Sequence, residues 1–110
     1  MELITAYIRP ALSHRVIEAL KHSGATNISI LHAKGLGLLE DPNDERYDAE
    51  FIEKSSAMMR LEIITDGESA ERYVRVIQQF AHTGKAGDGI VYVSDVWRTV
   101  KISTGEEGVV

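Results

Sequence analysis

The order of the expected secondary-structure elements constrains the fold of this 110-residue chain more than any other feature. Residues 2–9 alternate between two faces and stop at Pro10, which predicts a strand. Residues 13–23 carry apolar side chains at helical spacing, with Ser13 as the expected N-cap. A second alternating segment covers residues 27–34. The chain therefore opens with a strand, a helix and a strand.

The same order returns in the second half. It has a strand over residues 58–65, a helix over about 68–82, a strand over 90–94 and a short extended segment over 99–102. Two successive β-α-β units predict a single ferredoxin-like α+β domain over residues 1–110, with one antiparallel sheet and both helices on one face. The opposite face also carries apolar side chains: Leu3, Tyr7, Met58 and Ile64. Since an exposed apolar sheet face favours association, we expect a homo-oligomer.

A long segment without periodicity, over about residues 35–55, separates the two units. Its part from Glu40 to Arg46 is polar and turn-prone. A loop of this length in a small domain is usually functional or mobile. Its carboxylates could bind a cation or a basic partner, or they could simply keep a flexible loop solvated. Tyr47, the only tyrosine of the loop, is a candidate modification site.

A glycine-rich segment joins the second helix to the last strand; it reads Thr83-Gly84-Lys85-Ala86-Gly87-Asp88-Gly89. Glycine permits positive φ and lets a ligand approach the main chain. Successive N–H groups in such a loop suit an anion, and Lys85 adds a positive charge. The helix precedes the glycines and no Lys-Ser or Lys-Thr pair is present, so this is not a P-loop signature. Two interpretations remain: a phosphate-binding loop, or a turn that only joins two elements.

The composition excludes several function classes. The net charge of −5 argues against nucleic-acid binding. No apolar run is long enough to span a bilayer, and the N-terminus does not resemble a signal peptide. The chain has no cysteine, which excludes disulfides and fits a cytoplasmic location. The four histidines lack metal-ligand spacing and no supported nucleophile is present, so we expect no metal, no cofactor and no enzyme.

The glycine-rich segment and the apolar run after it closely resemble the C-terminal signature of the P-II nitrogen regulatory proteins. The resemblance extends along the whole chain without apparent gaps. Further matching segments are Ile8-Arg9-Pro10, Lys34-Gly35-Leu36-Gly37, Ala49-Glu50-Phe51, Leu61-Glu62-Ile63 and Thr104-Gly105-Glu106. The chain is therefore identified as a divergent P-II-like protein, with the family's T-loop over about residues 37–55 and its C-terminal loop over about 103–110.

The resemblance implies a homotrimer that binds adenine nucleotides in clefts between subunits. It also implies that the T-loop responds to the ligand and docks onto a target enzyme or transporter. The implied nucleotide-binding residues are Gly35, Gly37, Ile64, Lys85, Ala86, Gly87, Asp88, Gly89, Ile90 and Lys101. The implied partner-binding residues of the T-loop are Glu45, Arg46, Tyr47, Glu50 and Phe51. Trp97 and Tyr92 could stack on adenine, although a role in the core or at a subunit interface is favoured.

Departures from the family pattern reduce the set of metabolites that the protein is expected to bind. Leu39 and Met58 stand where the family has the glutamine and lysine that help to hold magnesium and 2-oxoglutarate. Phe51 stands in place of the tyrosine that is uridylylated, and it has no hydroxyl group. Burying a doubly charged oxoacid against apolar groups is costly. We therefore expect neither 2-oxoglutarate binding nor uridylylation.

Other departures bear on the nucleotide. The cations that the family places near a γ-phosphate are absent at Leu38, Ile90 and Ser103, and Lys101 replaces an arginine. Each lost charge-assisted hydrogen bond costs about 1.5–3 kcal/mol. Because the loss falls mainly on triphosphates, we expect ADP or AMP to be favoured, with ATP possible.

The expected function is that of a non-enzymatic signalling trimer that senses an adenine nucleotide and regulates a partner through the T-loop. A carbon- or bicarbonate-linked regulator and a conventional nitrogen-regulatory P-II protein are alternatives within the family. A weak nucleotide hydrolase and a structural protein with a vestigial cleft are alternatives of other classes. Turnover assays and nucleotide calorimetry distinguish these classes.

Overall fold

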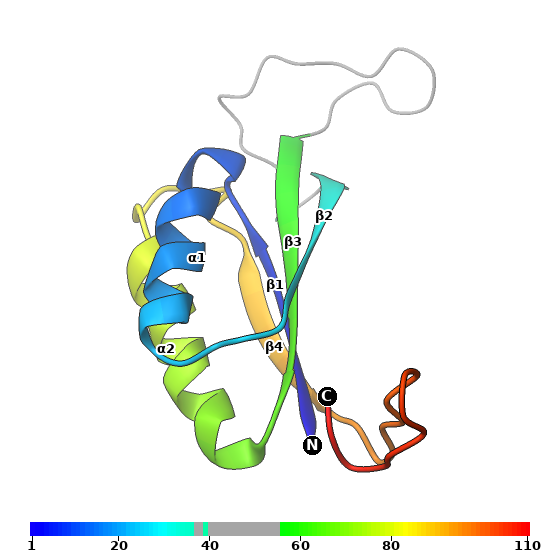
Figure 1. Cartoon of the computed structure of the whole chain (residues 1–110). Helices are drawn as coiled ribbons and strands as arrows, with labels where there is room; N and C mark the ends of the chain where they lie inside the picture. The colour runs from blue at the N-terminus through cyan, green and yellow to red at the C-terminus, as the bar shows by residue number, and fades with distance from the viewer. Residues whose placement is uncertain (37–38, 40–55) are drawn as a thin grey trace, which may run out of the picture.

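The computed structural model describes residues 1–36, 39 and 56–110. Its elements in chain order are β1 (Glu2–Ile8), the short 3₁₀ helix η1 (Pro10–Leu12), α1 (Ser13–His22), β2 (Ile28–Gly35), β3 (Ser56–Thr65), α2 (Gly67–Ala81) and β4 (Ile90–Asp95). Figure 1 shows both helices on the same side of the strands. Most of the expected T-loop lies outside the described residues.

The four strands form one sheet in the order β2-β3-β1-β4, and each neighbouring pair is antiparallel. The central strand β1, from the first half of the chain, pairs with both strands of the second half: Ala6 lies opposite Leu61 of β3 and Val91 of β4. This topology confirms the predicted ferredoxin-like α+β fold. It also brings the start of β4, and the glycine-rich segment before it, next to the end of β1.

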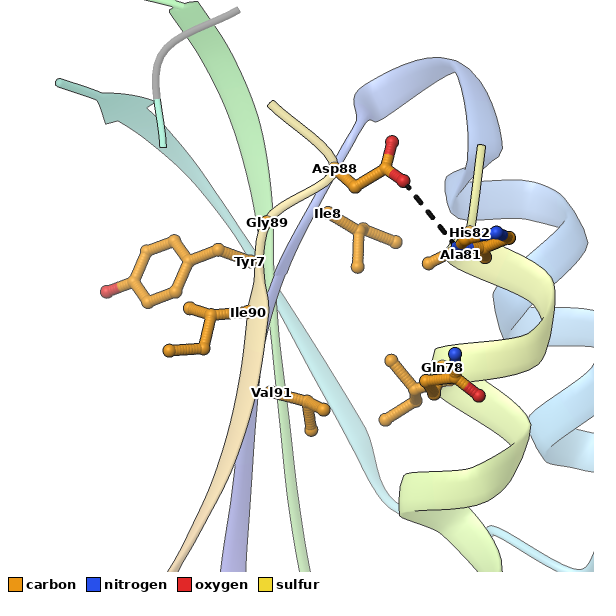
Figure 2. A pocket seen from close by; sticks show the side chains of 10 residues that line it. Tyr7, Ile8, Gln78, Ala81, His82, Asp88, Gly89, Ile90 and Val91 are labelled. Atoms are coloured by element: carbon orange, nitrogen blue, oxygen red, sulfur yellow. Dashed lines mark ion pairs between the residues drawn. The ribbon is translucent and has the colours of Figure 1, made fainter. Parts of the chain in front are cut away.

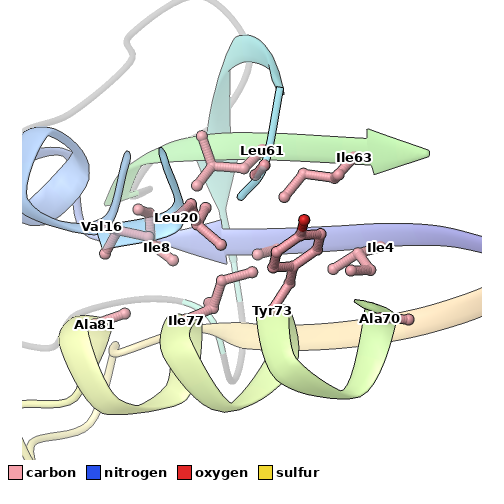
Figure 3. Close-up of a cluster of buried hydrophobic side chains, with 12 residues drawn as sticks. Ile4, Ile8, Val16, Leu20, Leu61, Ile63, Ala70, Tyr73, Ile77 and Ala81 are labelled. Atoms are coloured by element: carbon pink, nitrogen blue, oxygen red, sulfur yellow. The ribbon is translucent and has the colours of Figure 1, made fainter. Parts of the chain in front are cut away.

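The core lies between the sheet and the two helices. Helix α2 begins where the Asp66 side chain accepts the Ser69 main-chain N–H at 2.7 Å, which caps the first turn. The buried side chains of α2 recur every three or four residues and therefore share one face; they are Ala70, Tyr73, Ile77 and Ala81. Figure 3 shows them against Ile4 and Ile8 of β1. The helical and alternating patterns of the sequence are thus satisfied by one shared core.

The opposite face of the sheet remains partly exposed in the single chain. Thr5, at its centre, is buried beneath its neighbours, whereas Ile90 and Tyr92 of β4 are about half exposed. Arg60 donates to the Glu62 carboxylate at 2.7 Å, and its guanidinium lies 5.8 Å from the centre of the Tyr7 ring. Leu3, Tyr7 and Ile64 are partly exposed on this face, as the alternation of β1 and β3 predicted. Met58 is only 2% exposed, so its prediction as part of an exposed apolar face is wrong; its side chain packs between Gly35 and Gly89.

One local prediction is wrong and another holds only in part. Ser13 is the first residue of α1 rather than its N-cap, because η1 already starts the helical backbone at Pro10; the Ser13 hydroxyl instead donates to the Pro10 carbonyl at 2.7 Å. The short extended segment predicted over 99–102 is confirmed only around Val100, since a turn begins at Ile102. Val100 forms a single bridge with Glu107, and Gly105 donates to the Lys101 carbonyl at 2.7 Å, so the chain reverses within a tight turn.

The side chains of this C-terminal turn do not join the core. Trp97 is 91% exposed and Ile102 is 100% exposed. A core role for Trp97 within the single chain is therefore wrong.

Candidate functional site

The glycine-rich segment forms a tight loop between the end of α2 and the start of β4. Three of its residues have positive φ: Gly84 at 85°, Gly87 at 97° and Gly89 at 104°. At Gly89 the main chain also runs against β1, since a Cβ there would lie 1.8 Å from the Tyr7 carbonyl oxygen. No L side chain fits that position without moving the backbone. Glycine is thus required both by conformation and by close packing.

Asp88 organises this loop from within. Its Oδ2 accepts the main-chain N–H groups of Thr83 at 2.8 Å and Gly84 at 2.9 Å, and its Oδ1 accepts the Thr83 hydroxyl. Burial of the carboxyl would raise its pKa, but the hydrogen bonds from Thr83, Arg9 and Gly84 outweigh this and hold the pKa of Asp88 well below its usual range. Asp88 is therefore an anion at neutral pH, and it occupies two N–H groups of the loop.

Arg9, from the end of β1, connects this carboxylate to the rest of the protein. Its Nε donates to Asp88 Oδ1 at 2.9 Å, and its Nη2 donates to the Ala86 carbonyl at 2.9 Å. One guanidinium thus binds two points of the loop. The sequence indicated Arg9 only as part of a matching segment, because no local pattern reveals a partner 79 positions further along the chain.

The exposed edge of the loop is formed by Lys85, Ala86 and Gly89, whereas Gly87 is buried. The main-chain N–H groups of Gly87 and Asp88 donate to no acceptor among the residues that the structure describes. A loop with unused N–H groups and a neighbouring lysine can accept an anion.

A cavity of about 180 Å³ adjoins the loop, between the end of α2 and strands β1 and β4. Figure 2 shows Gln78, Ala81 and His82 of this region across from Ile8 and Val91. His82 Nδ1 lies 3.9 Å from Asp88 Oδ2. This volume is below the ~300–1,000 Å³ of most small-molecule pockets.

Met58 connects the two predicted glycine positions. It is only 2% exposed, and it fills the space between Gly35 and Gly89. A Cβ on Gly35 would lie 3.1 Å from Met58 Cγ and 2.9 Å from Leu39 Cβ, and a Cβ on Gly89 would lie 3.3 Å from Met58 Cε. The structure thus brings Gly35, Leu39, Met58 and Gly89 together in one apolar contact.

Other predicted site residues lie elsewhere. Ile64 pairs with Leu3, four residues along β1 from Tyr7, so it lies about 13 Å from Gly89 along the sheet. Lys101 lies in the segment after β4, which begins beside the N-terminus, since Val96 donates to the Met1 carbonyl at 3.0 Å. Ile90 lies beside the loop with its side chain half exposed. Gly37 and the five partner-binding residues of the T-loop lie outside the described residues: Glu45, Arg46, Tyr47, Glu50 and Phe51.

The described part of the chain offers little other chemistry. Among residues 1–36, 39 and 56–110, no three histidine, cysteine or acidic side chains come close enough to hold a metal ion. His14, His22, His32 and His82 are all exposed. Within the same residues, no helix has the length and apolar character needed to cross a membrane.

An antiparallel β2-β3-β1-β4 sheet that carries a glycine loop at the end of α2 defines a ferredoxin-like α+β domain. A family model described as Nitrogen regulatory protein P-II matches residues 1–106. The Nitrogen regulatory protein P-II of Azospirillum brasilense is 35% identical over 108 residues, which cover 98% of this chain and 96% of the relative.

Two further relatives agree. The Nitrogen regulatory protein P-II of Rhizobium meliloti is 33% identical over 108 residues, with 98% of this chain and 96% of the relative covered. Nitrogen regulatory protein P-II 1 of Escherichia coli K12 is 34% identical over 107 residues, with 97% and 96% covered. The chain belongs to the P-II family, whose members are regulatory signal-transduction proteins and not enzymes.

Proposed function

We propose that this P-II protein senses an adenine nucleotide through the glycine loop and transmits the bound state to a partner protein through its T-loop. The observation that carries the proposal is the geometry at Gly89, where positive φ and contact with the Tyr7 carbonyl hold the loop against the sheet. Unused N–H groups at Gly87 and Asp88, with Lys85 on the exposed edge, supply the anion-binding features. Adenine nucleotides are the ligands of the family.

The proposed site lies between subunits of a homotrimer. Ile64 and Lys101 lie at the opposite end of the sheet from Gly89, so Lys101 reaches a phosphate at this loop only from another subunit. The small cavity beside the glycine loop and the exposed Trp97 and Ile102 support a cleft completed by a neighbour. In this assembly the partly exposed sheet face, with Tyr92 and Ile90, becomes an interface.

The proposed ligand is ADP or AMP in preference to ATP. Ile90 and Ser103 supply no positive charge near the loop, and Lys101 supplies a single point charge where a bidentate arginine is expected. The main-chain groups serve every adenine nucleotide equally. The chain as a whole, residues 1–110, acts as one domain in the cytoplasm.

The apolar contact of Leu39, Met58 and the two glycines supports the proposed loss of the 2-oxoglutarate site. Met58 is buried where a charged lysine would hold the oxoacid, and a thioether offers no counter-charge. Together with Phe51 this favours a regulator that responds to nucleotide alone. A carbon- or bicarbonate-linked role remains the alternative context, and the T-loop residues Glu45, Arg46, Tyr47, Glu50 and Phe51 are the proposed partner contacts.

The test is a calorimetric titration with ATP, ADP, AMP and cyclic AMP, paired with light scattering and limited proteolysis. We expect a trimeric mass, saturable binding of ADP or AMP at least as tight as that of ATP, and slower cleavage at Arg46 and Lys54 in the bound protein. If none of the four nucleotides binds, the proposal is refuted. If ATP binds much more tightly than ADP, the charge argument is refuted.

A monomeric mass at micromolar concentration would contradict the cleft between subunits. Unchanged cleavage at Arg46 or Lys54 under saturating nucleotide would contradict transmission through the T-loop.

A further inference from the structure

The glycine loop holds a negative charge of its own at the place where an anion is proposed to bind. The Asp88 side chain is 23% exposed and ionised, and it already occupies the N–H groups of Thr83 and Gly84. A phosphate that approaches the N–H groups of Gly87 and Asp88 meets this carboxylate within the same short loop. A phosphate and a carboxylate within one short loop repel each other strongly unless a cation lies between or beside them.

Arg9 supplies that cation in a fixed geometry. Its side chain is 19% exposed, and its planar fork binds the Asp88 carboxylate with one nitrogen and the Ala86 carbonyl with another, both at 2.9 Å. The two acceptors flank Gly87. A bidentate guanidinium fixes both charge and orientation, which a single flexible ammonium does less well.

We infer that Arg9 is a positioning residue for the phosphate site: it neutralises Asp88 and fixes Ala86 and Asp88 so that the N–H groups between them face a nucleoside diphosphate. The inference rests on the proposed function. Arg9 itself need not touch the ligand, since both of these contacts are made to the loop. It acts on the site through the charge of Asp88 and through the position of the loop between Ala86 and Asp88.

The hydrogen-bond geometry predicts how substitutions at Arg9 and Asp88 should change the affinity for ADP. In Asp88→Asn, the amide oxygen can keep the Thr83 and Gly84 N–H groups, but the amide nitrogen then faces Arg9 Nε, and both are donors. In Arg9→Gln, the Asp88 charge has lost its cation. In the double variant, the introduced glutamine side chain can accept a hydrogen bond from the introduced asparagine amide, and neither position carries a charge. Arg9→Gln should weaken binding because the Asp88 charge is left without its cation, and it should do so far less in the Asp88→Asn background, where that charge is absent.

The experiment is a double-variant cycle measured by calorimetry with ADP and with inorganic pyrophosphate. The proteins are wild type, Arg9→Gln, Asp88→Asn, the double variant and Arg9→Lys. Arg75→Gln is the matched control, because it removes the same charge from an exposed pair on α2. Circular dichroism and molecular mass establish that each variant is folded and assembled like the wild type.

We expect Arg9→Gln to weaken ADP binding by about 10- to 100-fold, the loss expected for one charge-assisted contact. Arg9→Lys should lose less, Arg75→Gln should change nothing, and the double variant should return to within about threefold of the wild type. A double variant as weak as the weaker single variant would overturn the inference, because a merely structural role gives no repair. If Arg9→Gln alone fails to fold, the double variant still tests the inference, since adding Arg9→Gln to Asp88→Asn must then change ADP binding by no more than about threefold.

The two hypotheses fail in different ways. If the wild type binds ADP and Arg9→Gln binds it equally well, the inference fails and the proposed function stands. If pyrophosphate binds and its affinity changes across the variants as expected, but ADP does not bind, the anion site stands and nucleotide sensing fails. If the wild type binds neither probe, both are overturned.

Discussion

Replacing Gly89 by alanine is the sharpest test of the loop geometry. The added methyl group would lie 1.8 Å from the Tyr7 carbonyl oxygen and 2.8 Å from the Tyr7 carbonyl carbon. Carbon and oxygen atoms normally approach no closer than about 3.3 Å, so the two main chains must separate by about 1.5 Å. The residue also has a φ of 104°, which an L side chain rarely adopts.

The expected destabilisation follows from these two terms. Positive φ at a residue with a side chain costs about 1–3 kcal/mol. Separating β4 from β1 at the Tyr7–Ile90 pair disturbs the ladder and the packing of Met58, which adds about 2 kcal/mol more. The total of about 3–5 kcal/mol would lower the Tm by at least about 10 °C in a domain of this size.

Gly84→Ala is the matched control for this change. Gly84 lies in the same loop with a φ of 85°, but its added Cβ would meet only His82 ring atoms, at 3.7 and 3.8 Å. The Gly84→Ala variant therefore has the cost of a side chain at positive φ without the clash against β1. Urea unfolding followed by circular dichroism, at one fixed protein concentration, gives the free energy of unfolding of both variants. If Gly89→Ala is no more destabilised than Gly84→Ala to within about 1 kcal/mol, the close approach to β1 is wrong.

Three further predictions use other parts of the molecule. Calorimetry should detect no 2-oxoglutarate binding at sub-millimolar concentration, with or without ATP and magnesium, because Leu39 and Met58 offer no counter-charge; saturable heat would contradict this. Gly87→Val should abolish binding of ATP, ADP and AMP, because a β-branched residue does not tolerate a φ of 97°; a variant that still binds ADP with wild-type affinity would contradict the role of the loop. Asp88 has a pKa lowered in the folded state relative to about 3.9 when unfolded, so its contribution to stability is present above about pH 4 and is lost as the pH falls further. The free energy of unfolding should therefore fall less steeply with acid in Asp88→Asn than in the wild type, and equal slopes would show that Asp88 does not contribute.

The fold was predictable from the sequence because its two main signals are periodic. The alternation of Ile4, Ala6 and Ile8 and the helical spacing of Tyr73 and Ile77 both report on the same core. The errors arose where local signals compete. Ser13 is a strong capping residue, but Pro10 starts a helical turn earlier.

The candidate site was predictable only in part. Glycines at Gly87 and Gly89 are visible in the sequence because positive φ restricts residue type. The partnership of Arg9 with Asp88 joins positions at opposite ends of the chain, and no local pattern reports it. The separation of Lys101 from the loop follows only from the direction of β4. Residue identity therefore located the loop, while topology decided which side chains reach it.

The apolar contact around Met58 connects the departures from the family pattern to one physical consequence. Leu39 and Met58 are separated in the sequence by most of the T-loop, yet both lie against Gly35, and Met58 also reaches Gly89. An apolar residue at only one of the two positions would leave the other as an unpaired polar or charged group, which is costly when buried. Two apolar residues together close the space without such a group and keep the glycine loop in place. Under the proposed function, the base of the T-loop is thus coupled to the nucleotide site by packing rather than by a metal and an oxoacid, so nucleotide occupancy alone can set the loop's state.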